Sequence, residues 1–441
     1  MTTAQQFADR RDRVLERMGS GVMVIAAAPV AMRNNDVEHD YRQDSDLYYL
    51  TGFDEPNSVL VLSTVHEEHR MVLFVPPRDP EMETWHGVRA GVEGAVSRFG
   101  ADASFSIEEL AKHLPDYLEG AERVFHRIGQ DELFDAKVIE AIKQLRVRRR
   151  RTGAVAPSEI IDATRIVHAM RHRKDEAELG AMARAAEITA VAHARAMEVA
   201  RPGGHEYEVE AALVGTFRRE GAERPAYGTI VGGGVNGTIL HYTRNDAPLR
   251  DGELLLIDAG AEYDYYACDV TRTFPIGGRF TDAQRTLYDI VLAAERAGIA
   301  AVKPGATLHD VHMAALKVLV AGMIDAGLVE GPLDEAIEKE RYRPFYMHKT
   351  SHWLGMDVHD VGDYFVDGEH LPLQEGMVLT VEPGIYVAVD AKAPERFVGI
   401  GIRIEDDVAV TADGCHVLTD AIPKDPDELE RILQARPLAA E

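Results

Sequence analysis

The chain has 441 residues, 46% of them hydrophobic, and its 74 acidic against 48 basic residues give a formal net charge of −26. This length predicts about two or three domains with ample core, and the acidic excess argues against a nucleic-acid or anionic-membrane partner. With two cysteines, Cys268 and Cys415, and an N-terminus without an apolar signal core, the sequence favours a cytoplasmic enzyme.

The pattern over residues 1–171 predicts a mixed α/β domain. Helical periodicity is expected over residues 5–18, 107–118 and 131–145, and apolar runs predict strands at residues 22–27, 47–50, 59–62 and 71–75. Four consecutive arginines, residues 148–151, precede Gly153 and Pro157, which indicates a helix end and a linker. A run of like charge usually forms a solvated face, but here it could also meet the acidic surface of a second subunit.

A domain boundary is expected near His172, so the second domain covers residues 172–441. Asp175 and Glu178 form a capping-box pattern before a long alanine-rich helix that extends to about residue 200. Two similar segments, residues 200–213 and 302–316, each place a Pro-Gly turn before a helix start. This internal echo favours a domain of two halves related by pseudo-twofold symmetry, with the site between them.

Two aspartates follow apolar segments within residues 252–274. Asp258 ends an apolar run that predicts a buried strand, where a carboxylate is costly without a partner. If the strands pair symmetrically about a turn at Tyr263 and Asp264, Asp258 and Asp269 are directly opposed, with Cβ atoms about 5 Å apart. Two carboxylates that close require a cation or a bound proton. Two surface aspartates flanking a turn are the alternative for an isolated hairpin.

Histidines gather in the segment FYMHKTSHWLGMDVHDVG, which carries His348, His352 and His359. A single histidine is more often a packed or surface side chain than a ligand, but three in one glycine-punctuated segment make ligation as probable as packing. Further along, an apolar strand in MVLTVEPGIYV places Glu382 at its end.

A last strand alternates strictly. In GIGIRIEDDVAV, Arg403 and Glu405 point to one face, and Ile402 and Ile404 point to the other. Each acid could belong to a structural ion pair. A buried carboxylate at the end of each of three apolar strands is, however, explained more simply by metal ligation.

The candidate ligands together supply four carboxylates and one imidazole: Asp258, Asp269, His352, Glu382 and Glu405. This set is too oxygen-rich for a structural zinc site and suits a pair of Mn²⁺-like ions bridged by carboxylates. Two metals about 3.5–4 Å apart activate a bridging water and bind the reacting carbonyl. The predicted chemistry is hydrolysis.

The ordered motifs, with GTILHYTRN around His241, resemble the pita-bread metallopeptidase family, and within it the Xaa-Pro aminopeptidases (aminopeptidase P). The segment RNNDVEHDYRQDSDLYYLTGFDEP resembles the first domain of these enzymes and argues against a methionine aminopeptidase, which lacks it. SHWLG favours aminopeptidase P over prolidase. The resemblance implies an α/β N-terminal domain, residues 1–171. It also implies an α+β pita-bread (creatinase/aminopeptidase-like) catalytic domain with internal pseudo-twofold symmetry, residues 172–441.

The resemblance also implies roles for the ligands. Asp258 would bind one metal in bidentate fashion, Asp269 and Glu405 would bridge both metals, and His352 and Glu382 would complete the second site. Glu382 would also take the proton from the bridging water. The metals are expected to be two divalent ions per subunit, Mn²⁺ first, with Zn²⁺ or Co²⁺ as alternatives.

Residues around the metals receive supporting roles by the same resemblance. His348 and His359 would steady the substrate and the oxyanion, His241 would line the pocket near the scissile bond, and Tyr386 and Arg403 would orient ligands. Trp85, in ETWHGVRAG, would complete the substrate pocket of a neighbouring subunit in a homodimer or homotetramer. Lys349 departs from the pattern, because the family usually has glycine there.

The implied function is that of a cytoplasmic metallo-aminopeptidase that hydrolyses the N-terminal Xaa-Pro bond of peptides through a hydroxide bridged by two metals. Its substrates would be peptides with proline at the second position. Proline's tertiary amide and fixed φ keep ordinary aminopeptidases from such bonds, so a dedicated pocket is required. The alternatives are a prolidase-type Xaa-Pro dipeptidase and a non-catalytic binding protein on the pita-bread fold.

Overall fold

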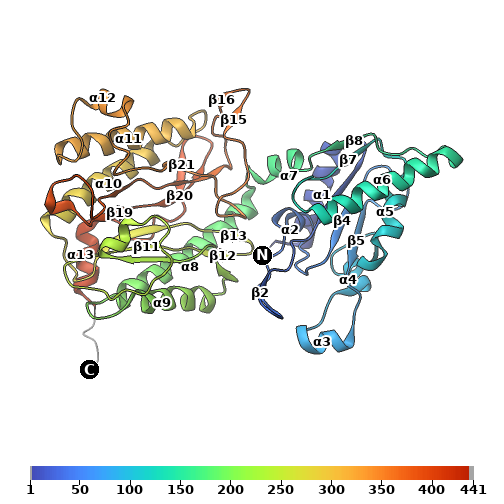
Figure 1. The fold of residues 1–441 in the computed structure, drawn as a ribbon, viewed down its shortest axis with the longest axis horizontal. Helices are drawn as coiled ribbons and strands as arrows, with labels where there is room; N and C mark the ends of the chain where they lie inside the picture. The colour runs from blue at the N-terminus through green and yellow to red at the C-terminus, as the bar shows by residue number, and fades with distance from the viewer. Residues whose placement is uncertain (1, 437–441) are drawn as a thin grey trace. The chain divides into compact units, whose positions relative to one another are not determined.

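The computed structural model describes residues 2–436, which form two compact units, one ending at Met170 and one beginning at Arg171 (Figure 1). The predicted ranges, 1–171 and 172–441, differ from this division by one residue. Their outer ends, residue 1 and residues 437–441, lie outside the described part of the chain. Among the helices of residues 2–436, none is both long enough and apolar enough to span a membrane.

The first unit is built on a six-stranded sheet with the order β6-β5-β4-β1-β7-β8. Its strands are β1 (Val22–Ala26), β4 (Val59–Ser63), β5 (Met71–Val75), β6 (Ala103–Ser106), β7 (Arg123–Phe125) and β8 (Glu159–Ile161). Only β4 runs antiparallel to its neighbours; the other adjacent pairs are parallel. Helices α5 (Leu110–Leu118) and α6 (Glu132–Thr152) lie beside this sheet (Figure 1). Their apolar side chains pack on the valine-rich strands to form the core.

The remaining elements of this unit are shorter or peripheral: α1 (Ala4–Met18), β2 (Met32–Asn34), β3 (Val37–Glu38), α2 (Ser45–Thr51), α3 (Pro80–His86), α4 (Gly91–Ser97), η1 (Ile107–Glu109) and α7 (Thr164–Arg171). The strand predicted at residues 47–50 is wrong, because this segment lies in α2. Asp44 accepts a hydrogen bond from the Leu47 N–H at the helix start, and Gly52 ends the helix with a left-handed φ of 66°. Both caps stabilise a helix over a run whose apolar pattern fits a strand equally well.

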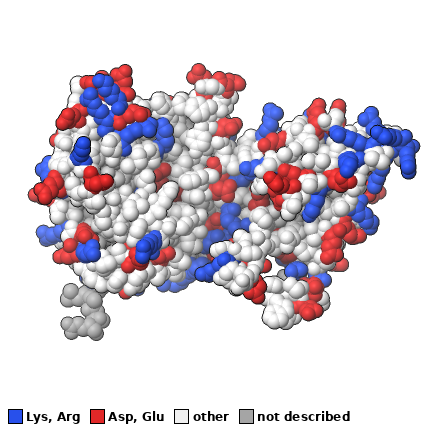
Figure 2. Space-filling model, in the orientation of Figure 1, with Lys and Arg blue, Asp and Glu red and all other residues white. Residues whose placement is uncertain are grey.

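Helix α6 continues through the arginine run and ends at Gly153, whose φ is 76°. The run is therefore the last part of a helix, as predicted, and the linker begins only after it. Figure 2 shows Lys and Arg side chains gathered at this end of α6. These arginines are exposed, and Arg148 pairs with Asp116 at 2.6 Å.

The second unit contains two similar halves, each with a pair of packed helices and a three-stranded antiparallel sheet. The first half has α8 (Glu176–Val199), α9 (Glu206–Arg219) and the sheet β10-β11-β14, formed by Ile230–Gly233, Leu254–Asp258 and Thr271–Pro275. The second has α10 (Asp282–Ala301), α11 (Leu308–Asp325) and the sheet β17-β20-β21, formed by Val378–Val381, Asp406–Val410 and Cys415–Val417 (Figure 1). The Pro-Gly turns noted in the sequence precede α9 and α11.

Smaller elements complete the second unit: β9 (Arg224–Pro225), η2 (Gly234–Thr238), β12 (Ala261–Tyr263), β13 (Tyr266–Ala267), α12 (Leu333–Glu338), β15 (Phe365–Val366), β16 (Glu369–His370), β18 (Gly384–Tyr386), η3 (Glu395–Phe397), β19 (Gly401–Arg403) and α13 (Pro426–Gln434). The predicted start of α8 is confirmed, since Asp175 and Glu178 form a reciprocal capping box. Ile402 and Ile404 are fully buried in the core that the four long helices share, which confirms the predicted alternation.

The pairing predicted for the first two aspartates is wrong by two residues. The hairpin turns at Asp264 and Tyr265, both with positive φ, so that Tyr263 pairs with Tyr266 and Asp258 pairs with Thr271. Asp269 is thus a diagonal neighbour of Asp258 rather than its direct partner. Gly260 allows this arrangement, because a Cβ there would lie 1.7 Å from the Cys268 carbonyl oxygen.

Candidate active site

The ends of the strands in the second unit surround a cavity of about 620 Å³. Several of the predicted site residues line it together: His241, Asp258, Asp269, His348, His352, His359, Glu382, Arg403 and Glu405. Tyr386 lies behind this wall, where its hydroxyl contacts His348 and Arg403. Trp85 belongs to α3 of the first unit and is 78% exposed.

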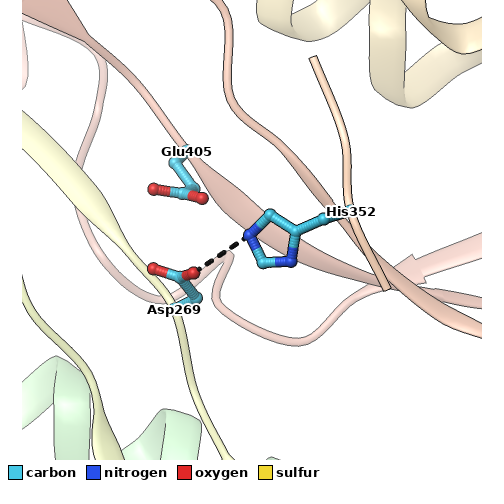
Figure 3. Close-up of side chains that lie close together, drawn as sticks. All are labelled: Asp269, His352 and Glu405. Atoms are coloured by element: carbon cyan, nitrogen blue, oxygen red, sulfur yellow. Dashed lines mark ion pairs between the residues drawn. The ribbon is translucent and has the colours of Figure 1, made fainter. Parts of the chain in front are cut away.

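Three of the predicted ligands form the tightest group (Figure 3). One donor atom from each of Asp269, His352 and Glu405 lies within 4.8 Å of the others. His352 Nε2 is 3.3 Å from Asp269 Oδ2 and 3.8 Å from Glu382 Oε1. The other ring nitrogen, Nδ1, lies 3.0 Å from the Trp353 carbonyl oxygen and donates to it. Burial opposes protonation of His352, but the hydrogen bond with Asp269 and the charge of Asp269 outweigh it and raise the pKa of His352 to about 9, so that Nε2–H points to the carboxylates. Because Nδ1 is held by the Trp353 carbonyl, Nε2 is the nitrogen that would bind a metal after losing this proton.

Neutral and cationic donors hold the carboxylates in place. The Tyr227 hydroxyl donates to Asp258 Oδ1 at 2.6 Å, and Arg403 Nη2 donates to Asp258 Oδ2 at 2.5 Å. The Thr271 hydroxyl donates to Glu405 Oε2 at 2.6 Å and also accepts from Arg403 Nε. Each of these two carboxylates thus keeps a fixed orientation before any ion or substrate arrives.

The electrostatics of the group favour bound cations. Burial raises the pKa of Asp258 and of Glu405, with repulsion from neighbouring carboxylates adding to it, and burial raises the pKa of Glu382 to about 7. For Asp269 burial opposes ionisation, but the hydrogen bond with His352 outweighs it and lowers the pKa. Four carboxylates facing one guanidinium leave a negative excess that two divalent ions would balance. The donor set therefore fits the dinuclear site that the sequence predicts.

Both ring nitrogens of His348 form hydrogen bonds with neighbouring groups. Nδ1 donates to the Lys349 carbonyl oxygen at 2.8 Å, so Nε2 accepts from the Tyr386 hydroxyl at 2.9 Å. Tyr386 in turn accepts from Arg403 Nη1 at 3.1 Å. Burial lowers the pKa of His348 to about 4, which keeps the ring neutral near pH 7. His348 could contact a substrate only by giving up one of these bonds.

His359 is placed differently. Its ring lies edge-on to His352 at a centroid distance of 4.5 Å, and no other described residue hydrogen-bonds to its ring. Burial lowers its pKa, so a neutral ring with a free N–H faces the cavity. His241 is exposed and also lines the cavity. These two histidines are the ones that can reach a substrate without breaking an existing bond.

A network of buried charges lies directly behind the ligands. Arg272 is fully buried and donates to the Glu405 carbonyl oxygen at 2.6 Å and to Asp406 Oδ1 at 2.7 Å. Asp406 also accepts from Thr419 and Lys424, and Lys424 bonds Glu295 at 2.7 Å. The backbone of the bridging candidate Glu405 is therefore fixed by a side chain on the neighbouring strand.

The sequence interpretation missed several of these supporting residues. Polar residues on an otherwise apolar strand, Thr271 and Arg272 in TRTF, are a signal that could have indicated a polar layer. The acidic pair after Glu405 is a similar signal for Asp406. Tyr227 lies in a loop, and nothing in its surroundings distinguishes it from an ordinary surface tyrosine.

A buried histidine at the start of this unit predicts a pH-dependent stability. Burial, followed by the charge of Lys174, lowers the pKa of His172 to about 4, whereas an unfolded histidine titrates near 6.5. Between these values the unfolded state binds a proton that the folded state does not, so the unfolding free energy falls as the pH decreases from about 6.5 to 4. The slope reaches at most about 1.4 kcal/mol per pH unit.

The variant His172→Gln lacks this proton uptake. In urea titrations of metal-free protein, we expect the wild type to lose stability with decreasing pH more steeply than the variant across this window, and equally above pH 7. Parallel curves for the two proteins from pH 7 to 4 would contradict the assignment.

Comparisons with known proteins follow the same division of the chain. Residues 180–412 match Metallopeptidase family M24, and residues 7–125 match the aminopeptidase P N-terminal domain. The chain is 45% identical over 433 residues to an Xaa-Pro aminopeptidase of Escherichia coli, covering 98% of both chains. Its structure is similar to that of an aminopeptidase from Pseudomonas aeruginosa, with a TM-score of 0.96, 46% identity and 99% of each chain covered. It is also similar to a zinc-substituted E. coli aminopeptidase P in complex with product, with a TM-score of 0.95, 44% identity and 99% of each chain covered.

Proposed function

Because the chain belongs to Metallopeptidase family M24 and is closely similar to Xaa-Pro aminopeptidases along its whole length, we propose that it is an Xaa-Pro aminopeptidase. It is a metal-dependent hydrolase that removes the first residue of a peptide whose second residue is proline. The predicted fold, an α/β N-terminal domain followed by a pita-bread catalytic domain, is confirmed by the structural likeness.

Five side chains would hold the metal ions: Asp258, Asp269, His352, Glu382 and Glu405. Their convergence on one cavity supports a pair of divalent ions, and the oxygen-rich set favours Mn²⁺ over Zn²⁺ or Co²⁺. When bound, such ions supply Lewis acidity that makes water a nucleophile at neutral pH and polarises the scissile carbonyl.

The chain's own groups divide the remaining work. The Glu382 carboxylate lies 3.6 Å from His348 and 3.8 Å from His352 in the cavity, where it could accept a proton from the attacking water and pass it to the leaving nitrogen. His359 can donate its free N–H to an oxygen of the substrate. Arg403 and Tyr227 keep Asp258 oriented, and Thr271 does the same for Glu405.

The cavity wall also suits proline. Ile230, Leu240, Val358 and Tyr364 contribute an apolar lining next to the polar ligands. A peptide bond to proline has no N–H to donate, so a site for it needs shape and apolar contact rather than a backbone acceptor. We propose that the proline ring packs on this lining.

The observation that carries the proposal is the meeting of four carboxylates and one imidazole in a single cavity of a chain with this similarity. The test compares a tripeptide, Ala-Pro-Ala, with the dipeptide Ala-Pro in the metal-loaded protein. We expect release of free alanine and Pro-Ala from the tripeptide. A protein that cleaves the dipeptide and leaves the tripeptide intact would be a prolidase, and the proposal would be wrong.

Trp85 supports a proposal about assembly. An indole that is 78% exposed on a short helix is a common feature of surfaces that bind a partner. We propose a homodimer or homotetramer in which Trp85 contributes to the substrate pocket of a neighbouring subunit. Trp85→Ala is then expected to lower kcat/KM for tripeptides and longer substrates about tenfold, with an unchanged melting temperature.

The control for Trp85 is Leu133→Ala, which removes an apolar side chain that is 80% exposed on α6 and should leave kcat/KM unchanged. Sedimentation of both variants would report assembly. A wild-type protein that is monomeric and fully active would contradict the assembly proposal. A cytoplasmic location is proposed on the basis of the two cysteines, both of which are free thiols.

A further inference from the structure

Lys349 is an uncommitted cation in the wall of the active-site cavity. Of the residues that line this cavity, Arg403 and Lys349 carry a permanent positive charge. Arg403 is buried and engaged by Asp258, Thr271 and Tyr386. Lys349 is exposed, and within residues 2–436 its ammonium has neither an ion-pair nor a hydrogen-bond partner.

The backbone around Lys349 is fixed although its side chain is free. Its carbonyl oxygen accepts from His348 Nδ1 at 2.8 Å. The next residue, Thr350, is fully buried, and its hydroxyl contacts His312 Nδ1 at 2.8 Å and the Tyr346 hydroxyl at 2.7 Å. The ammonium therefore moves on a flexible stem from an anchored Cα, next to His348 in the cavity lining.

His312, which lies near Lys349, does not carry a second positive charge. Burial, and then the charge of Lys349, lowers the pKa of His312 to about 4, so that its ring is neutral near pH 7. Other charged residues of the lining are the four candidate carboxylate ligands and Arg403, and two divalent ions would offset the four carboxylates. In a chain with a formal charge of −26, a free ammonium in the lining of this cavity is a specific attraction for an anionic group.

We propose that Lys349 binds a carboxylate of the peptide substrate and so determines which Xaa-Pro peptides are preferred. This inference rests on the proposed aminopeptidase function and adds a substrate class, acidic or short peptides. The carboxylate could come from an acidic first residue, from an acidic residue after proline, or from the C-terminus of a tripeptide. All three present the same anion to the ammonium.

The experiment uses the full-length, metal-loaded protein and three matched peptide pairs at low salt. Glu-Pro-Ala amide is compared with Gln-Pro-Ala amide, Ala-Pro-Glu amide with Ala-Pro-Gln amide, and Ala-Pro-Ala with its amide. An exposed ion pair contributes modestly, so we expect the anionic member of at least one pair to be preferred about threefold to tenfold in kcat/KM. The pair that shows the preference identifies the source of the carboxylate.

Two variants separate charge from shape. Lys349→Met keeps an unbranched side chain without the charge and should abolish the preference, and Lys349→Arg should retain it. The preference of the wild type should also shrink as NaCl is raised from about 0.05 to 0.5 M, because salt screens exposed charges. The control is Lys303→Met, an exposed lysine outside the cavity lining, which should keep the wild-type ratios.

The inference is overturned if Lys349→Met leaves the ratio of every pair unchanged while all six peptides are hydrolysed. If the wild type hydrolyses none of them although it holds its metals, the proposed function itself fails, and the inference fails with it. The neutral peptides distinguish these two results, because their hydrolysis does not depend on Lys349.

Discussion

Replacing Glu405 with alanine is expected to reduce the hydrolysis of Xaa-Pro-Xaa peptides by about a thousandfold or more. Glu405 is 2% exposed. One of its carboxylate oxygens lies within 4.8 Å of a ligand atom of Asp269 and of a ligand atom of His352. Glu405 would be one of the residues that hold the metal ions, and a water molecule cannot supply the negative charge that its carboxylate would bring there. The measurement is kcat/KM on a tripeptide together with metal bound per chain.

The same variant should fold normally. Burial and repulsion from neighbouring acids raise the pKa of Glu405, so that removing its charge relieves strain in the metal-free state. We expect an unchanged or higher melting temperature without metal, and a smaller gain in melting temperature on adding Mn²⁺. Glu330→Ala, which removes an exposed carboxylate of the same unit, should behave as wild type. A Glu405→Ala protein with two bound metals and full activity would contradict the ligand assignment.

Replacing Arg272 with methionine is expected to lower the unfolding free energy by about 3–5 kcal/mol. The guanidinium is fully buried and is the partner of Asp406, which is also fully buried. Its loss would leave Lys424 as the remaining cation beside the carboxylate, and would free the carbonyl oxygens of Ile422 and Glu405. The free energy is measured by urea unfolding of metal-free protein.

A matched control is available on the surface. Arg285 bonds two aspartates, Asp289 and Asp427, but its side chain is 35% exposed. Arg285→Met should therefore cost only about 0–1 kcal/mol. Arg272→Lys keeps the charge and provides a folded comparison if the methionine variant is too unstable. Equal losses of unfolding free energy for Arg272→Met and Arg285→Met would show that the buried pair of Arg272 and Asp406 does not stabilise the fold more than a surface pair does.

The sequence was most informative where a local pattern determines the structure. Asp258, Glu382 and Glu405 were predicted from their positions at or beside apolar strands, and the structure places all three in one cavity. The start of α8 followed from a capping box that needs only neighbouring residues. Such features depend on a few consecutive side chains, so they can be recognised without knowing the fold.

Features that depend on pairing were harder to predict. The hairpin between Asp258 and Asp269 offered two adjacent turn positions, and the observed one requires positive φ at both Asp264 and Tyr265. The short apolar run of residues 47–50 fits a helix or a strand equally well. Arg272 donates hydrogen bonds to Asp406 and to the Ile422 carbonyl, each more than a hundred residues away in the sequence. No local sequence pattern predicts such a contact.

The most direct test of the central claim is a metal titration of tripeptide hydrolysis. Metal-free protein, prepared with a chelator, is loaded with Mn²⁺ in steps, and the release of alanine from Ala-Pro-Ala is measured together with metal bound per chain. We expect activity at background in the metal-free protein and full activity as the bound metal approaches two ions per chain. Full cleavage by the metal-free protein, or no cleavage at two ions per chain, would contradict the assignment of this cavity as a dinuclear Xaa-Pro aminopeptidase site.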